Sequence, residues 1–191
     1  YGTTDVTRTV SLENKSRNIK NIYTRVLKGH IAVSNFKIKK NTTGSIVDKN
    51  ARKFLRKIKL DYPHGTGHGV GHYLSVHEGP HRISKFSNVA FKEGMIVSNE
   101  PGFYHEGKFG IRIENLILVQ KSEMEPNNSF LEFETLSFVP IDQRLISVRL
   151  LNEHEIEWIN NYHLQCWEKV HNKVDTKTQA WLENMTKPIE K

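Results

Sequence analysis

Residues 99–104 read Asn-Glu-Pro-Gly-Phe-Tyr and residues 110–115 read Gly-Ile-Arg-Ile-Glu-Asn, and these two segments carry the strongest structural signals in the chain. Each contains a carboxylate, Glu100 in the first segment and Glu114 in the second. The Pro-Gly pair that follows Glu100 predicts a tight turn and keeps Glu100 out of a helix interior. The first acid is therefore expected at a turn.

The second acid belongs to a run, residues 109–119, in which a period of two predicts a strand. Ile111 and Ile113 are expected to face the interior, while Arg112 and Glu114 share the opposite face. A carboxylate on so apolar a strand is costly unless a partner compensates its charge. A bound cation is one such partner.

The composition is that of a soluble globular protein of 191 residues, enough for one sizeable domain or one domain with a small appendage. No apolar run reaches eighteen residues, so no membrane partner is expected. Cys166 is the single cysteine and cannot form an internal disulfide, which fits a reducing cytosol. The sequence predicts a cytoplasmic protein in which Cys166 is a buried thiol on a helix.

The net charge of +7 raises the question of a nucleic-acid partner. The densest basic cluster alternates at helical spacing with apolar residues, as on the solvated face of an amphipathic helix. Aromatic residues are not interleaved with these charges as base stacking requires. We therefore predict no nucleic-acid partner and a solvated face made of Arg52, Lys53, Arg56, Lys57 and Lys59.

Helical and strand-like patterns are mixed without a regular alternation, which indicates an α+β fold with a largely antiparallel sheet and covering helices. Ser45 is expected to cap the second helix. The predicted helices are 14–34, the segment from Ser45 to Ile58, 152–171 and 176–185; the predicted strands are 3–10, several runs within 89–119, 130–133 and 136–141; and 121–129 is a predicted loop.

Residues 64–80 differ in texture, with four Gly and four His in the fourteen positions up to His77. His64 and His68 have the spacing of a zinc-binding helix, but the intervening Gly-Thr-Gly argues against a helix. The Gly pattern lacks the Lys-Ser/Thr of a phosphate-binding loop, so nucleotide binding is not expected. Glycines let a ligand approach the backbone closely, and a metal or an extended peptide is the more plausible ligand.

A metal site can be assembled from these segments. Asp5 lies on one face of the predicted strand 3–10, and together with Glu100, Glu114 and one His it makes an oxygen-rich ligand set. Such a set suits Mn, Co or Zn. Carboxylates can also bridge two ions, the arrangement that two-metal hydrolases use.

At these residues the chain resembles Xaa-Pro aminopeptidase (aminopeptidase P), a family of the methionine-aminopeptidase/prolidase superfamily with the pita-bread (creatinase/aminopeptidase) fold. The resemblance rests on Asp-Val-Thr-Arg-Thr at 5–9, the His/Gly run, the two segments quoted first, and the tail motifs at 142–146 and 158–163. It implies that residues 1–122 are the C-terminal portion of the catalytic domain. It further implies that residues 129–189 are the C-terminal extension, and that a homodimer forms.

The resemblance also implies a dinuclear site, with manganese as the expected metal and zinc or cobalt as alternatives. Asp5 and Glu114 would bridge the ions, and His68 and Glu100 would complete the ligands of one ion. Glu100 would accept a proton from the attacking water. The reaction would release the N-terminal residue of peptides with proline at the second position.

Three further residues receive roles from the resemblance. His64 and His77 would bind the substrate, through hydrogen bonds to the scissile amide and the tetrahedral intermediate. Arg112 would offset the concentrated negative charge. The family's first Asp ligand would lie before Tyr1, so the fold is expected to be incomplete at the N-terminus and the isolated chain to be inactive or nearly so.

Two alternatives keep the fold and change the function. One is a non-catalytic module that binds peptides or proteins; the other acts on dipeptides, as a prolidase does, or on initiator methionine. The four ligands at Asp5, His68, Glu100 and Glu114 favour a peptidase. The long Gly-rich run and the C-terminal helices weigh against the prolidase reading.

Overall fold

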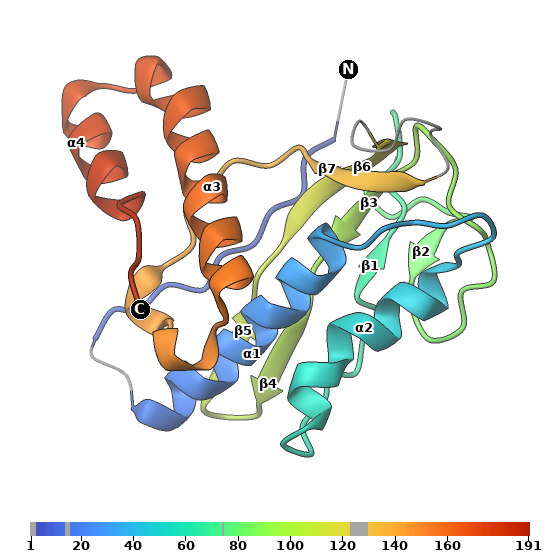
Figure 1. Cartoon of the computed structure of the whole chain (residues 1–191), viewed down its shortest axis with the longest axis horizontal. Helices are drawn as coiled ribbons and strands as arrows, with labels where there is room; N and C mark the ends of the chain where they lie inside the picture. Colours follow the sequence, from blue (N-terminus) through green and yellow to red (C-terminus); the bar gives the residue numbers. More distant parts are fainter. Residues whose placement is uncertain (1–2, 14–15, 74, 123–129) are drawn as a thin grey trace.

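The computed structural model describes residues 3–13, 16–73, 75–122 and 130–191. Helix α1 (Arg17–Ser34) and helix α2 (Gly44–Arg56) lie side by side across the strands (Figure 1). Ser16 caps α1 by accepting a hydrogen bond from the Ile19 backbone N–H at 3.4 Å, as Ser does at many helix starts. The predicted first helix is confirmed from Arg17 onward, and residues 14–15 lie outside the described residues.

The prediction that Ser45 caps the second helix is wrong. Thr43 occupies the N-cap position in an extended conformation (φ −101°, ψ 160°), and Ser45 already lies inside α2. The Ser45 hydroxyl is 2.9 Å from the Thr43 hydroxyl, so the two side chains share a hydrogen bond at the start of the helix. The apolar face of α2 is as predicted, because Val47, Ala51 and Leu55 are buried.

The main sheet has the order β3 (Ile96–Asn99), β6 (Asn115–Lys121), β7 (Leu131–Thr135), and both pairings are antiparallel. Val97 opposes Ile117, and Val119 opposes Phe133. These side chains belong to one of the two apolar clusters of the described chain, where they pack with residues of α1 and α2. The α+β class with antiparallel strands is therefore confirmed.

The predicted strand 109–119 is divided in two. β5 (Phe109–Arg112) forms a hairpin with β4 (Gly102–His105), whereas β6 pairs with β3 and β7. The strand pairing changes at residues 113–114. Residues before this point pair with β4, and residues after it pair with β3 and β7. At this break Glu114 forms an isolated antiparallel bridge with Thr7. Ile113 is fully buried there, as the alternation predicted.

Two other predicted strands are wrong. The segment 3–10 forms no strand and makes only the single bridge at Thr7, because Thr9 contacts the backbone of Arg112 in β5 through its hydroxyl and not through its own backbone. Residues 136–141 are irregular. The predicted strand 130–133 is confirmed as part of β7, while 123–129 of the predicted loop lie outside the described residues.

The His/Gly run is not helical, as predicted. It contains the short strand β1 (Gly67–His68), which pairs with β2 (Arg82–Ile83), and turns on either side. A Cβ atom on Gly67 would lie 1.8 Å from the Ser98 carbonyl oxygen. Only glycine can therefore bring this strand so close to β3.

The C-terminal helices are confirmed. α3 (Glu153–Val170) begins with a capping box between Asn152 and Glu155, and α4 (Thr176–Met185) follows a short 3-10 turn, η3 (His171–Lys173). Two further 3-10 turns, η1 (Gln143–Leu145) and η2 (Val148–Leu150), precede α3. Cys166 is fully buried on α3, as predicted.

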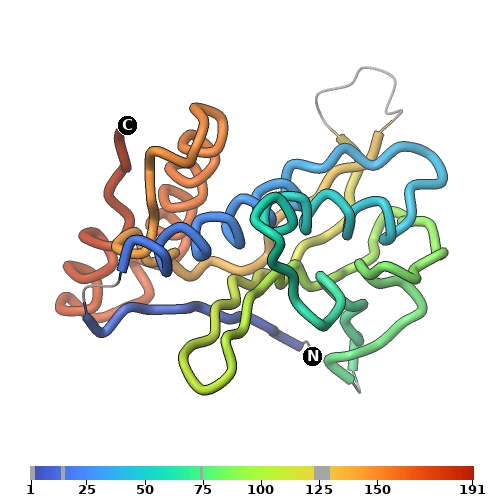
Figure 2. Tube along the Cα trace, turned by 90° about the horizontal axis from the view of Figure 1, so that it is seen from below, coloured from blue at the N-terminus to red at the C-terminus, as the bar shows by residue number. Residues whose placement is uncertain are grey.

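One apolar cluster joins the two ends of the chain. Ile159 and Tyr162 of α3 lie in the same cluster as Val26 and Leu27 of α1 and Ile113 of the strand break. Figure 2 shows α3 and α4 gathered at one end of the molecule, next to the start of α1. The tail is thus built into the core that supports residues 113–114.

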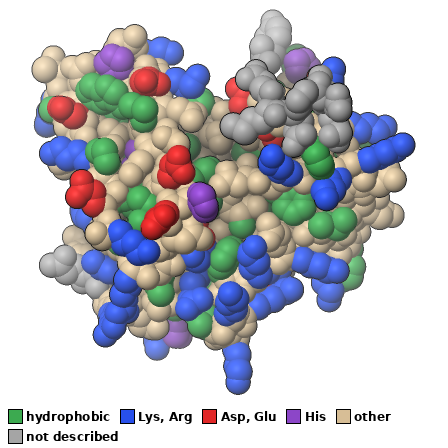
Figure 3. Space-filling model, in the orientation of Figure 1, with side chains coloured by type: hydrophobic (Ala, Val, Ile, Leu, Met, Phe, Trp, Pro, Cys, Tyr) green, Lys and Arg blue, Asp and Glu red, His purple; other side chains and the backbone are tan. Residues whose placement is uncertain are grey.

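The predicted solvated basic face needs one correction. Lys and Arg side chains spread widely over the surface seen in Figure 3, but Arg52 is only 6% exposed. Its guanidinium turns inward to Asp48 and Asp61, because charged acceptors are available there. None of the described helices is long and apolar enough to cross a membrane.

Candidate metal centre and substrate cleft

Glu114 is held where β5 gives way to β6. Its backbone N–H donates to the Thr7 carbonyl at 3.0 Å, and the Thr7 hydroxyl donates to Glu114 Oε2. The residue is only 2% exposed. The bridge fixes the N-terminal segment beside the strand break, and so brings Asp5, two residues before Thr7, to the same place.

Glu100 lies in the two-residue connection between β3 and β4 and outside any helix, as predicted. The tight turn predicted after it is not formed, because Gly102 already belongs to β4 and pairs with Arg112. Its Oε1 atom accepts a hydrogen bond from the Ser98 hydroxyl at 3.1 Å, and Arg112 Nη1 donates to Oε2 at 3.3 Å. Its backbone N–H donates to the Thr66 carbonyl at 2.7 Å. The carboxylate is thus oriented from both oxygens while its backbone is tied to the His/Gly segment.

His68 turns one ring nitrogen to two carboxylates. Its Nδ1 lies 2.9 Å from the Gly69 carbonyl, which can only accept, so Nδ1 carries a hydrogen. The other nitrogen, Nε2, lies 3.4 Å from both Asp5 Oδ2 and Glu100 Oε1. An imidazole whose far nitrogen is fixed by a backbone carbonyl is the usual form of a metal-ligating histidine.

The four predicted metal ligands therefore converge, although they come from four separate segments of the chain. Ligand atoms of His68, Glu100 and Glu114 all lie within 4.8 Å of one another, and so do those of Asp5, His68 and His77. Carboxylates held this close to one another repel unless a positive charge lies among them. The donor set, three carboxylates and an imidazole, fits divalent ions such as Mn, Co or Zn.

The protonation of Glu114 reflects the same crowding. Burial raises the pKa of the Glu114 carboxyl, and repulsion from the Glu100 and Asp5 carboxylates raises it further. The hydrogen bond from Thr7 and the positive charge of Arg112 oppose this rise. A divalent cation would relieve the repulsion that the protein alone does not neutralise.

A cleft of about 530 Å³ opens beside these ligands. His64 and His77, the predicted substrate-binding residues, both line it, and Arg112 lies at its wall. The ring of His77 meets that of His68 edge to face, with centroids 4.3 Å apart. All seven predicted site residues thus contribute to one continuous region of ligands and cleft.

Sequence reasoning missed several residues that support this site. Tyr104 lines the cleft and its hydroxyl lies 2.8 Å from His64 Nε2; the hydroxyls of Thr7 and Ser98 bind the two Glu carboxylates. Tyr104 closes the first quoted segment and Ser98 precedes it, so nearness to Glu100 was a usable signal. Thr7 gave none, because its partner is remote in sequence.

A cluster of carboxylate and imidazole ligands beside a histidine-lined cleft is the kind of site that metal-dependent hydrolases use. The sequence agrees: residues 1–121 match the metallopeptidase family M24, and residues 129–189 match the C-terminal region of peptidase M24. The chain therefore belongs to metallopeptidase family M24 and has its pita-bread fold.

Individual relatives are closely similar. Aminopeptidase P2 of Arabidopsis thaliana is 48% identical over the whole chain, and the probable Xaa-Pro aminopeptidase P of Laccaria bicolor is 47% identical over 98% of it. The chain spans about a third of their length or less, 28% and 30%.

Solved structures point to the same group. The X-prolyl aminopeptidase of Caenorhabditis elegans, described as a cytosolic enzyme with a di-nuclear active site, superposes with a TM-score of 0.92 at 40% identity. That match covers 98% of this chain and 32% of the enzyme. Prolidase from Pyrococcus furiosus matches less fully, with a TM-score of 0.60 at 30% identity, over 70% of this chain and 36% of that enzyme.

Proposed function

We propose that this chain carries the metal centre of an Xaa-Pro aminopeptidase, which releases an N-terminal residue that precedes proline. The observation that carries the proposal is the convergence of Asp5, His68, Glu100 and Glu114 on one cluster. Two observations support Xaa-Pro peptides as the substrate. The relatives are named as aminopeptidases P, and the C. elegans X-prolyl aminopeptidase matches 98% of the chain.

We propose a pair of divalent ions at this cluster, with manganese as the metal and zinc or cobalt as substitutes. Asp5 and Glu114 would be shared by the two ions, and His68 and Glu100 would complete the ligands of one. Bound divalent ions polarise a carbonyl and lower the pKa of water, which makes hydrolysis feasible at neutral pH. By analogy with the C. elegans enzyme, which is described as cytosolic, the protein would act in the cytosol. We further propose that the C-terminal extension contributes to a homodimer.

The chain's own residues then supply the remaining steps. Glu100 accepts a proton from the attacking water, because it is the acid that both borders the cleft and accepts a hydrogen bond from Arg112. Arg112 holds the carboxylate in place at 3.3 Å. His64 and His77 line the cleft, where they would bind the scissile amide and the oxygen of the tetrahedral intermediate; for His64 the substrate would replace the Tyr104 hydroxyl at Nε2.

Replacement of Glu100 by Gln tests this function. The change keeps the shape of the side chain and removes the proton acceptor, so hydrolysis of Xaa-Pro peptides in added Mn²⁺ should fall at least about 100-fold. The matched control is Glu106→Gln, an exposed acid in the turn between β4 and β5, which should leave the rate unchanged. An active Glu100→Gln protein would rule out the proposed role.

The choice between an aminopeptidase and a prolidase depends on the length of the peptide. An Xaa-Pro aminopeptidase cleaves tripeptides and longer peptides with proline second, whereas a prolidase requires an Xaa-Pro dipeptide. The longer peptides should account for whatever cleavage the chain retains. Cleavage of the dipeptide alone would assign the prolidase function, and tight peptide binding by a chain with no affinity for Mn²⁺ would assign the non-catalytic one.

A further inference from the structure

Arg52 of α2 is a buried charge that the proposed mechanism does not use. Its Nε atom donates to Asp48 Oδ2 at 2.8 Å, and its Nη1 atom donates to Asp61 Oδ1 at 2.7 Å. A guanidinium removed from water costs several kcal/mol unless its donors are satisfied. Arg52 satisfies them with two carboxylates and with backbone carbonyls beyond them.

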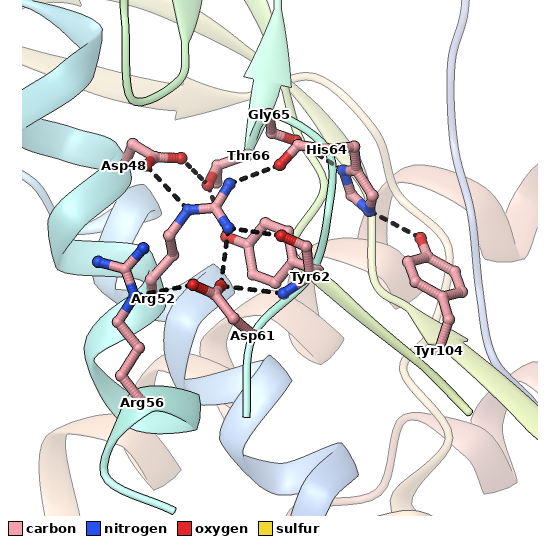
Figure 4. A network of polar contacts seen from close by, with 9 residues as sticks. All are labelled: Asp48, Arg52, Arg56, Asp61, Tyr62, His64, Gly65, Thr66 and Tyr104. Carbon is pink, nitrogen blue, oxygen red and sulfur yellow. Dashed lines mark hydrogen bonds and ion pairs between the residues drawn. The ribbon is translucent and has the colours of Figure 1, made fainter. Parts of the chain in front are cut away.

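These further acceptors all lie in one segment, residues 61–66, which leads from α2 into β1. Nη1 also donates to the Tyr62 carbonyl at 2.8 Å, and Nη2 donates to the His64 carbonyl. The guanidinium lies over the Tyr62 ring, 3.9 Å from its centroid. Figure 4 shows the fork of Arg52 inserted between α2 and this segment, with the His64 ring on the other side.

Asp48 closes the network from the helix side. Its Oδ1 atom accepts a hydrogen bond from the Thr66 hydroxyl at 2.7 Å, while the Thr66 hydroxyl also contacts that of Tyr62. Asp48 and Arg52 therefore hold the segment at its beginning, middle and end. A lysine could not do so, because its three donors radiate from one atom whereas the guanidinium offers a planar fork.

The held segment has two connections to the candidate site. His64 Nδ1 lies 2.7 Å from the Gly65 carbonyl, so Nδ1 carries the hydrogen and Nε2 accepts from the Tyr104 hydroxyl at 2.8 Å. The Thr66 carbonyl accepts the backbone N–H of Glu100. The orientation of the His64 ring and the backbone of Glu100 both depend on where residues 64–66 lie.

We propose that Arg52 is a positioning residue for the substrate-binding His64, acting through the backbone of residues 61–66. This inference rests on the proposed function for the role of His64, but the contact between Arg52 and the segment does not. Apolar side chains of similar volume in place of Arg52 and its carboxylate partners could leave the protein equally stable, since buried ion pairs are weak stabilisers. What the fork adds is a fixed geometry for the segment that carries His64.

Arg56 provides a matched control one turn further along α2. Its Nε atom donates to Asp61 Oδ2 at 2.9 Å, so it shares an ion-pair partner with Arg52. Its side chain is 48% exposed, and the hydrogen bonds of residues 62–66 do not include it. Loss of Arg56 therefore removes an Asp61 contact without releasing the backbone of His64.

The test that does not depend on activity is ¹⁵N NMR of histidine-labelled chain at pH 8, with the His64 signal assigned through His64→Gln. We expect the Nδ1–H tautomer of His64 in the unsubstituted chain and in Arg56→Gln, and its loss in Arg52→Lys. If Arg52→Lys does not fold, Thr66→Val breaks the same network more gently and should displace the His64 signal. An unmoved His64 signal in the folded variant overturns the proposal.

Kinetics of the metal-loaded protein give the second arm. Displacement of a substrate-binding group should lower kcat/KM for an Xaa-Pro peptide about 10- to 100-fold in Arg52→Lys. In a His64→Gln background the same change should have little further effect, and fully additive losses overturn the proposal. An inactive parent is the result expected of the isolated chain, and in that case the NMR arm alone decides the role of Arg52.

Discussion

Thr7 and Glu114 are joined twice, by a backbone hydrogen bond of 3.0 Å from the Glu114 N–H and by a hydrogen bond from the Thr7 hydroxyl to the Glu114 carboxylate. This bridge is the point at which the N-terminal segment meets the break between β5 and β6. It sets the distance between Asp5 and the other proposed ligands. The metal centre therefore depends on a contact between residues remote in sequence.

Replacement of Thr7 by Val removes the hydroxyl and keeps the size and branching of the side chain. Because partners that orient a ligand typically contribute 10- to 100-fold to metal affinity, we expect Mn²⁺ affinity to fall by about that factor. Calorimetric titration measures it. Thr4→Val, at an exposed position of the same segment, should bind Mn²⁺ as before, and equal affinities in both variants would contradict this reading.

Arg8 ties the same segment to the tail. It donates to the Glu114 carbonyl, to the Asn115 amide oxygen and to the Tyr162 hydroxyl, each at 2.6 Å. Arg8→Gln leaves these part-buried groups unpaired, so the free energy of unfolding should fall by about 2–4 kcal/mol. Urea unfolding checks this against Arg17→Gln, an exposed change at the start of α1. Similar losses in both would mean that the Arg8 contacts do not stabilise the fold.

Ile159 tests whether the tail shares the core. The residue is fully buried in the cluster that includes α1, so Ile159→Ala should lower the free energy of unfolding by about 2–5 kcal/mol. The whole chain should unfold in a single transition. Leu164→Ala on the same helix removes a side chain that is half exposed and should cost much less. Separate transitions for the tail and the remainder would refute a shared core.

His163 makes the stability depend on pH. Burial, together with the nearby charge of Arg8, lowers the pKa of His163 from 6.5 to about 4. The unfolded chain therefore binds a proton first as the pH falls, and stability is lost between about pH 6.5 and 4, by about 3 kcal/mol in all. Protonation would also remove the acceptor that His163 Nε2 offers to the Ile141 N–H at 3.1 Å.

The measurement for His163 is urea unfolding at pH 7 and pH 4.5. His163→Gln lacks the titrating group, so it should lose less stability than the parent over this interval. His154→Gln, whose side chain is almost fully exposed, should follow the parent. Equal losses in the parent and His163→Gln would show that His163 does not titrate as expected.

The sequence predicted local structure best where one segment determined it. The non-helical position of Glu100, the non-helical His/Gly run and the helices of the tail follow from Pro, Gly and apolar spacing within a few residues. The strand predictions at 3–10 and 136–141 were wrong because extended backbone becomes a strand only beside a partner, and partners are set by the tertiary fold.

Residue type and the family resemblance predicted the ligands and cleft residues of the site. They did not predict the residues that hold these side chains in place. Asp5, His68, Glu100 and Glu114 belong to recognisable motifs. Arg52 was assigned to the solvated face because its neighbours Lys53 and Arg56 are basic. Its burial depends on how the chain after α2 folds back to bring Asp61 and two backbone carbonyls to the guanidinium. The Asp48–Arg52 spacing of four residues was the one local signal for that pair.

The central claim is that Asp5, His68, Glu100 and Glu114 bind the same metal cluster, and diffraction from crystals soaked in Mn²⁺ tests it most directly. The account predicts anomalous peaks about 2 Å from ligand atoms of all four side chains, where direct coordination requires them. Peaks that engage other residues, or no peak at this cluster at saturating Mn²⁺, would contradict it.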